Sequence, residues 1–220
     1  MSAYRQSYFW DSDSPLGNLT GLSLLIMGSA RLSWAVTITG SLIWVYGLTS
    51  FTFSALSKNI NKKFFPMNGR SSLLTVFASL WGSIYLLLFW LLSPLAALEI
   101  FLPLMLVPLY CASSGIGKQI TNLKEDPQYD IYDNISEAIY HAFILSALLI
   151  IFSFIREPLS YSSLSFPGSY RGMIMIFQFN DSDFFPVRLF ISSAGALILL
   201  GFFAGLYQYS KNRIFPGEKK

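Results

Sequence analysis

The sequence predicts an all-α integral membrane protein with six transmembrane elements, and three observations support this prediction. Of its 220 residues, 53% are apolar and 12% are charged, whereas soluble domains carry roughly 25% charged residues. Between residues 32 and 210, charge-poor apolar runs of bilayer length alternate with short polar gaps. Two further apolar runs, near Gly28 and Pro103, contain residues that interrupt helices.

Four segments are long enough to cross a bilayer as uninterrupted helices. A spanning helix needs roughly 20 mostly apolar residues. The segments that meet this requirement are 32–56, 72–93, 135–155 and 189–209. We therefore predict four full spans.

The other two apolar segments are predicted to be broken or half-length helices. Segment 16–30 is short and rich in glycine and serine. Segment 95–114 contains Glu99, Pro103 and Pro108, and a proline inside a helix removes a hydrogen bond and forces a kink or a break. We expect both segments to lie within the membrane, where non-helical backbone is usually kept for ions, substrates or cofactors.

The six elements follow one another as two triplets, each with a broken element before two full spans. We predict a single membrane domain with an N-terminal tail (1–15), a first repeat (16–94), a second repeat (95–210) and a basic C-terminal tail (211–220). Because each repeat crosses the membrane three times, the second repeat should be inverted relative to the first.

The positions of lysine and arginine predict the orientation, since these residues collect in cytoplasmic loops. Basic residues cluster between the second and third elements and at the C-terminus: Lys58, Lys62, Lys63 and Arg70, then Lys211, Arg213, Lys219 and Lys220. Six crossings then place both termini in the cytoplasm and segment 156–188 outside. With a net charge of +3, the basic residues report topology rather than nucleic-acid binding.

Two stretches of the first repeat match a known pattern. Ala35-Val36-Thr37, after a turn that contains Gly28, resembles the segment G-x-C-x-x-L-A-V-T. Residues 50–56 (SFTFSAL), before a basic loop, resemble the stretch that follows the second helix in the same pattern.

The second repeat adds three matches in the same order. Residues 102–115 resemble I-P-L-I-x-x-N-C-x-x-x-G, with Cys111 at the cysteine. Arg156-Glu157, followed by Leu164 and Gly168, resembles R-E-x-x-G-x-G-x-L-F-G. Residues 181–185 (DSDFF), before an Ala/Gly-rich last helix, resemble the end of the pattern. Together the chain resembles the RnfE/NqrD-type membrane subunits of the Rnf and Na⁺-translocating NADH:quinone oxidoreductase (Nqr) complexes.

This resemblance implies an inverted repeat in which the broken first and fourth elements meet near the middle of a bacterial cytoplasmic membrane. It also implies a homologous partner of opposite orientation, the RnfA/NqrE type. In the family, each of the two subunits supplies two cysteines to a shared [2Fe–2S] cluster. The cluster carries electrons across the membrane, and the complex couples this transfer to Na⁺ or H⁺ transport. The chain would be part of an oxidoreductase complex and not an enzyme by itself.

The chain departs from the family at the first of its two cysteine positions. Arg31 stands there, and arginine has no acceptor with which to bind a metal. Cys111, the only cysteine in the chain, matches the second position and is the candidate metal ligand. A cluster would need three thiolates with Ser29 or water as the fourth ligand, and the alternative is that no cluster is bound.

Each candidate residue also has a simpler interpretation. Cys111 is either a cluster ligand or a structural residue, because free cysteines commonly pack as small apolar side chains. Arg31 is either the counter-charge of an anionic cofactor or carboxylate, or a side chain that reaches an interface. Glu99 either has a proton or Na⁺ role, paired with Arg31 across the repeat, or lies at the headgroup level.

Two other functions are compatible with the same pattern. The first is a scaffold subunit that has lost its cluster. The second is a transporter of small solutes or ions, in which Arg31, Glu99 and the broken elements would form the substrate site and Cys111 would be dispensable.

Overall fold

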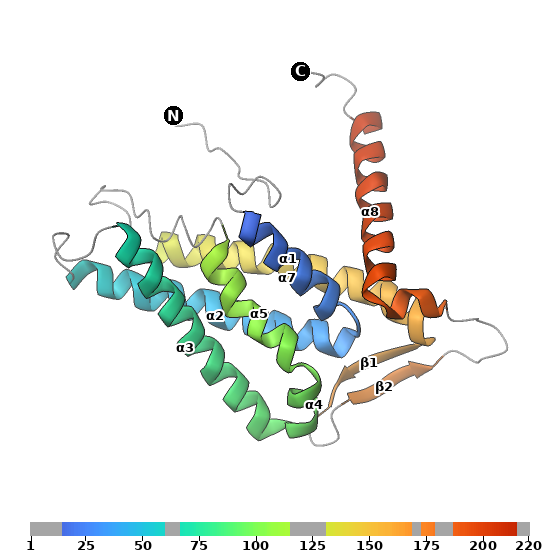
Figure 1. The fold of residues 1–220 in the computed structure, drawn as a ribbon, viewed down its shortest axis with the longest axis horizontal. Coiled ribbons are helices and arrows are strands. Elements are labelled where there is room, and N and C mark those ends of the chain that lie inside the picture. Colours follow the sequence, from blue (N-terminus) through green and yellow to red (C-terminus); the bar gives the residue numbers. More distant parts are fainter. Residues whose placement is uncertain (1–14, 60–66, 115–130, 169–172, 179–186, 215–220) are drawn as a thin grey trace.

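The computed structural model describes residues 15–59, 67–114, 131–168, 173–178 and 187–214, and this part of the chain is mostly helical (Figure 1). Three helices are long and apolar enough to cross a membrane: α2 (Leu32–Asn59), α3 (Met67–Leu92) and α7 (Ile131–Tyr161). They correspond to the predicted spans 32–56, 72–93 and 135–155, so these three predictions are confirmed as helices of spanning length.

Helices α2 and α7 pack against each other in antiparallel orientation. The first residue of α2, Leu32, lies beside Glu157 near the end of α7, and Gly47 lies beside Ile139 in the first half of α7. The contact is filled by fully buried apolar side chains, which include Leu42, Val45, Leu145 and Leu149. α3 packs on another side of α2, where the Tyr85 hydroxyl donates to the Thr37 carbonyl over 2.9 Å.

Two short helices, α1 (Pro15–Gly28) and α5 (Phe101–Ser113), also pack together in antiparallel orientation. The start of α1 meets the end of α5, because the Thr20 hydroxyl lies 3.0 Å from the Ser113 hydroxyl. A Cβ atom on Gly17 would lie 2.7 Å from the Ser113 carbonyl oxygen. The two backbones therefore approach at a point that leaves no room for a side chain.

The fourth element is broken as predicted, and the break lies at Ile100. Helix α4 (Pro94–Glu99) ends before Ile100, and α5 begins at Phe101. Pro103 lies in the first turn of α5, where backbone N–H groups have no partner within the helix, so its missing N–H costs little. Pro108 lies inside α5 without ending it. In an unbroken helix the N–H at position 103 would bond to the Glu99 carbonyl, and proline has no N–H, so Pro103 favours the break at Ile100.

A β-hairpin follows α7, and the sequence interpretation did not include it. α7 continues to Tyr161, six residues beyond the predicted end of its span at residue 155. Ser162 then turns the chain with a positive φ of 52°. Strand β1 (Ser163–Pro167) pairs in antiparallel orientation with β2 (Met173–Gln178), with a register irregularity between Leu164 and Ser165.

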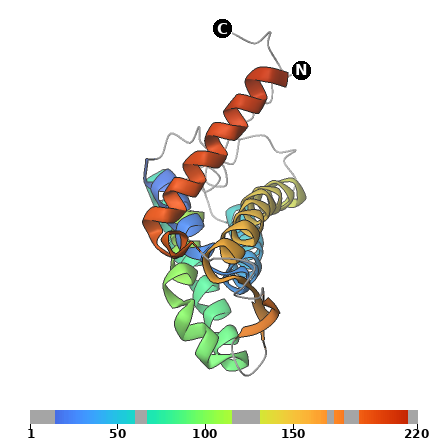
Figure 2. The same cartoon turned by 90° about the vertical axis from the view of Figure 1, so that its right-hand side faces the viewer.

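The predicted fourth span, 189–209, is not confirmed. Residues Arg188–Ile191 form a 3₁₀ turn, η1, and helix α8 begins at Ser193 and ends at Ile214. Its apolar part, Ser193–Leu206, is shorter than a spanning helix. In both views α8 projects away from the other helices (Figures 1 and 2). Neither six spans nor an inverted repeat is established by the described helices.

Candidate functional site

The turn between α1 and α2 lies against two consecutive charged residues of α7, Arg156 and Glu157. Their side chains are 2% and 1% exposed. A charge removed from water is costly unless hydrogen bonds replace the lost hydration. The contacts of these two side chains therefore determine what this site is.

Arg156 binds the end of α1 with one nitrogen of its guanidinium group. Nη1 donates to the Ile26 carbonyl over 2.6 Å and to the Ser29 hydroxyl over 3.1 Å. The last four carbonyl groups of a helix have no partner within it, and the negative end of the helix dipole favours a cation there. Arg156 therefore caps the C-terminus of α1.

The other two nitrogens of Arg156 bind the 3₁₀ turn before α8. Nε donates to the Phe190 carbonyl over 2.9 Å, and Nη2 donates to the carbonyls of Ile191 and Ser192 over 3.1 and 3.3 Å. A guanidinium group has five N–H donors, and all five are used. The Arg156 side chain joins α7 to the end of α1 and to the turn before α8. It has no N–H donor left to bind an anionic ligand.

Glu157 binds on the other side of the same break. Oε2 accepts a hydrogen bond from the backbone N–H of Leu32 over 2.7 Å, and Oε1 accepts one from the N–H of Ser165 over 3.0 Å. Leu32 is the first residue of α2, where N–H groups lack partners and the helix dipole favours an anion. Glu157 therefore joins α2 to β1.

Hydroxyl groups complete the polar contacts around the break. The Ser165 hydroxyl donates to the Ser33 hydroxyl over 3.2 Å, and the Ser160 hydroxyl donates to the Arg156 carbonyl over 2.7 Å. We call the set of Arg156, Glu157 and their hydrogen-bond partners the Arg-Glu clamp. Its chemistry is that of a structural clamp, because its charges are committed to backbone groups.

Two of the sequence-predicted residues lie at this clamp. Ser29 is fully buried, and its hydroxyl accepts from Arg156. Arg31 lies in the turn between α1 and α2, with its guanidinium carbon 5.1 Å from the centre of the Tyr161 ring. This distance suits a cation–π contact.

Cys111 lies elsewhere, near the middle of the bundle. It is fully buried in the main core cluster. The Ser114 hydroxyl binds both the Cys111 carbonyl (3.2 Å) and the Tyr46 hydroxyl (3.1 Å). Tyr46 is 14 residues into the 28-residue helix α2. The end of α5 therefore packs against the middle of α2.

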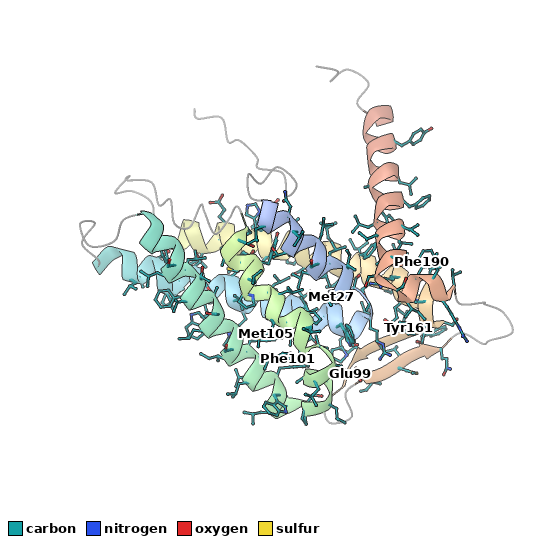
Figure 3. All side chains as sticks on the ribbon, in the orientation of Figure 1. Met27, Glu99, Phe101, Met105, Tyr161 and Phe190 are labelled. Carbon is teal, nitrogen blue, oxygen red and sulfur yellow. The ribbon has the colours of Figure 1, made fainter. Side chains whose placement is uncertain are left out.

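Glu99 is exposed at the end of α4, beside the break at Ile100. Figure 3 places it at the end of the bundle that also holds Tyr161 and the hairpin, with Phe101 and Met105 following along α5. Glu99 and Arg31 therefore share one end of the bundle, away from Cys111.

The two positions to which the resemblance assigns cluster ligands do not meet. Cys111 is two residues from Ser113, which contacts the start of α1, whereas Arg31 follows the end of α1. Among the described residues, no group of three or more His, Cys, Asp and Glu side chains is placed to hold a metal ion. Ser29 is bound by Arg156. The donors of the described chain do not fit a [2Fe–2S] cluster.

The sequence interpretation used Arg156 and Glu157 only as part of a family motif and gave them no role. A signal was available, because adjacent charges at the end of a long apolar segment are costly and usually have a specific purpose. What the sequence could not supply was their partners, which lie up to 130 residues away.

Comparisons with protein families, with curated proteins and with solved structures found no match for this chain. The class of protein is therefore defined by the fold alone. It is a mostly helical chain, consistent with a membrane protein, in which three helices are long and apolar enough to cross a bilayer.

Proposed function

We propose that this chain is an integral, multi-pass subunit of an ion-translocating electron-transport complex of the Rnf/Nqr kind. It would lie in the bacterial cytoplasmic membrane beside a homologous RnfA/NqrE-type subunit of opposite orientation. The support from sequence is the order of five short matches, which extend over nearly the whole chain. The support from geometry is a short first helix, α1, whose turn into α2 is held on both sides by the Arg-Glu pair of one of those matches.

Of the two roles within such a complex, the geometry favours the scaffold. One observation carries this choice: Cys111 is fully buried among side chains of its own chain, far from the Arg31 position. A subunit of this kind would contribute helix packing and orientation to the complex. Electron transfer across the membrane would then use cofactors of other subunits, and coupling to Na⁺ or H⁺ transport would be a property of the whole complex.

The test is purification of the complex from native membranes through a tag on this chain. We expect a homologous membrane subunit and subunits with redox cofactors to be recovered with it. Deletion of the chain should abolish Na⁺ or H⁺ uptake driven by NADH or reduced ferredoxin. Recovery of the chain without redox partners, together with unchanged uptake after deletion, would overturn the proposal.

The Cys111→Ser variant separates the scaffold role from the redox role. We expect unchanged iron, acid-labile sulfide and low-temperature EPR signals in the purified complex. Loss of a reduced [2Fe–2S] signal in this variant would assign Cys111 as a ligand supplied to a shared cluster and would overturn the scaffold role.

A transporter is the second candidate, because Glu99 and Arg31 lie at the same end of the bundle, beside the two broken elements. It requires solute or ion flux that is lost in Arg31→Gln or Glu99→Gln and does not depend on electron donors. Flux into proteoliposomes that contain this chain alone would favour the transporter over the redox complex.

A further inference from the structure

The first strand of the β-hairpin, β1, has its serines toward the helices and its large apolar side chain outward. In β1, Ser163 and Ser165 are buried, with 8% and 4% of their surface exposed, whereas Phe166 is 44% exposed. Hairpins that face water on one side show the opposite arrangement, with apolar residues on the core and polar residues outside. The outer side of this hairpin is therefore suited to an apolar environment.

Strand β2 extends the same apolar surface. Cross-strand pairing places Leu164 opposite Phe177 and Phe166 opposite Ile174. Ile174 and Phe177 are 57% and 56% exposed, and Met175 and Ile176 between them are 67% and 62% exposed, so β2 is apolar and exposed on both sides. Neither strand contains a charged residue. We call the four cross-strand residues the hairpin patch: Leu164, Phe166, Ile174 and Phe177.

The depth of the hairpin follows from its hydrogen bonds. The N–H and the hydroxyl of Ser165 bind Glu157 (3.0 Å) and Ser33 (3.2 Å). Both partners belong to apolar helices long enough to span a membrane, in the segments Leu32–Leu56 and Ile135–Tyr161. Glu157 lies four residues before the end of α7, about 6 Å along the helix axis.

Figure 1 shows the hairpin folding back from the end of α7 toward α4. The middle of β1 is thus level with the last turn of α7.

Two features place the hairpin near the surface of the membrane and not in its hydrocarbon core. Arg31 lies over the ring of Tyr161, and such amphipathic side chains are typical of the boundary between headgroups and acyl chains. The sheet has two strands, so within the described residues no strand lies beside the outer edge of β2. Backbone groups on such an edge need polar partners, and these are absent from the hydrocarbon core.

We infer that the hairpin is a lipid-binding element. The hairpin patch inserts among the acyl chains at the boundary of one leaflet, while the outer edge of β2 meets headgroups and water. Phospholipid is the partner because the strands are level with helices whose own outer faces meet acyl chains, and because the patch carries no charge. The inference rests on the membrane placement proposed above and not on electron transport.

The test measures the surroundings of a spin label on the full chain in phosphatidylcholine/phosphatidylglycerol nanodiscs. Phe166→Cys and Phe177→Cys are each made in a Cys111→Ser background and labelled. Collision rates with oxygen, which partitions into lipid, and with a water-soluble nickel chelate are then measured by EPR. Leu87→Cys, at a 55% exposed position of α3, is the lipid control, and Ser136→Cys, at an exposed position near the start of α7, is the polar control.

We expect the oxygen-to-nickel ratio at both patch positions to be several-fold higher than at position 136 and to approach the ratio at position 87. A ratio equal to that at position 136 would mean that the patch faces water. Low rates with both reagents would mean that protein covers it. Either result overturns the inference while leaving membrane placement intact, whereas a low ratio at position 87 would overturn both.

Discussion

Arg156 and Glu157 are neighbours in the chain, yet they cap opposite sides of the break between α1 and α2. Arg156 donates to the carbonyl of Ile26 in the last turn of α1, and Glu157 accepts from the N–H of Leu32 at the start of α2. Each charge has the sign that its helix end favours. A dipeptide on α7 therefore holds both ends of a turn more than 120 residues earlier in the chain.

Replacing Arg156 by lysine should destabilise the protein although the charge is kept. An ammonium group has three donors at one point, so it cannot reach both α1 and η1 as the guanidinium does. Leaving buried carbonyls without donors costs about 1–3 kcal/mol for each group. We expect a loss of about 3 kcal/mol in the free energy of unfolding, measured in detergent micelles by circular dichroism.

The control for this substitution is Arg188→Lys, because Arg188 is exposed on η1 and exposed substitutions usually change stability by less than about 0.5 kcal/mol. Equal stability of Arg156→Lys and Arg188→Lys would contradict the structural role of the clamp.

Replacing Glu157 by glutamine should also destabilise the protein, by a smaller amount. The amide oxygen can still accept from Leu32 or from Ser165, but the amide nitrogen then faces the other N–H as a second donor. We expect a cost of about 1–3 kcal/mol, the penalty for a buried polar group without a partner. Glu99→Gln at the exposed end of α4 is the matched control, and unfolding of both variants in one detergent gives the comparison.

Local pattern was enough to predict the spans 32–56, 72–93 and 135–155 and the short first element, because length and apolar composition determine these features. It also predicted that segment 95–114 is broken, because Pro103 lacks the N–H that a continuous helix would need there. It missed the hairpin, because the residues that hold β1, Ser33 and Glu157, belong to other helices.

The spatial arrangement of the candidate residues could not be predicted from local pattern, for a similar reason. Cys111, Ser29, Arg31 and Glu99 were chosen for their chemistry and for their places in a motif. Whether such residues meet depends on the antiparallel packing of α1 against α5, which separates Arg31 from Cys111. Packing of this kind involves contacts across about 90 residues of chain and leaves no trace in a short pattern.

A methyl group on Gly195 should disturb the clamp without touching its charges. The added Cβ atom would overlap the Leu189 carbonyl oxygen and lie 2.8 Å from the Phe190 Cα atom. The backbone of η1 would have to move, and its carbonyls would leave Arg156. We expect Gly195→Ala to cost about 2 kcal/mol, within the range for overpacking, as measured by thermal unfolding.

Gly201→Ala is the matched control, because nothing lies within 4 Å of an added Cβ atom there. Alanine favours a helix interior over glycine by about 1 kcal/mol, so this variant should be as stable as the native chain or slightly more stable. Similar destabilisation by both substitutions would show that helix α8, rather than the turn before it, responds to the change.

The thiol of Cys111 should resist chemical modification in the folded chain. It is fully buried, and Tyr46, Tyr110 and Ser114 around it are themselves buried in the bundle. Because a maleimide must reach the thiol, N-ethylmaleimide should react with Cys111 many-fold more slowly in mild detergent than in denaturant, as followed by mass spectrometry. A cysteine at position 136, exposed near the start of α7, provides the accessible control in Ser136→Cys with Cys111→Ser. Equal rates at positions 111 and 136 in the folded protein would mean that α5 opens readily, and the core between α5 and α2 would then be less closely packed than these contacts imply.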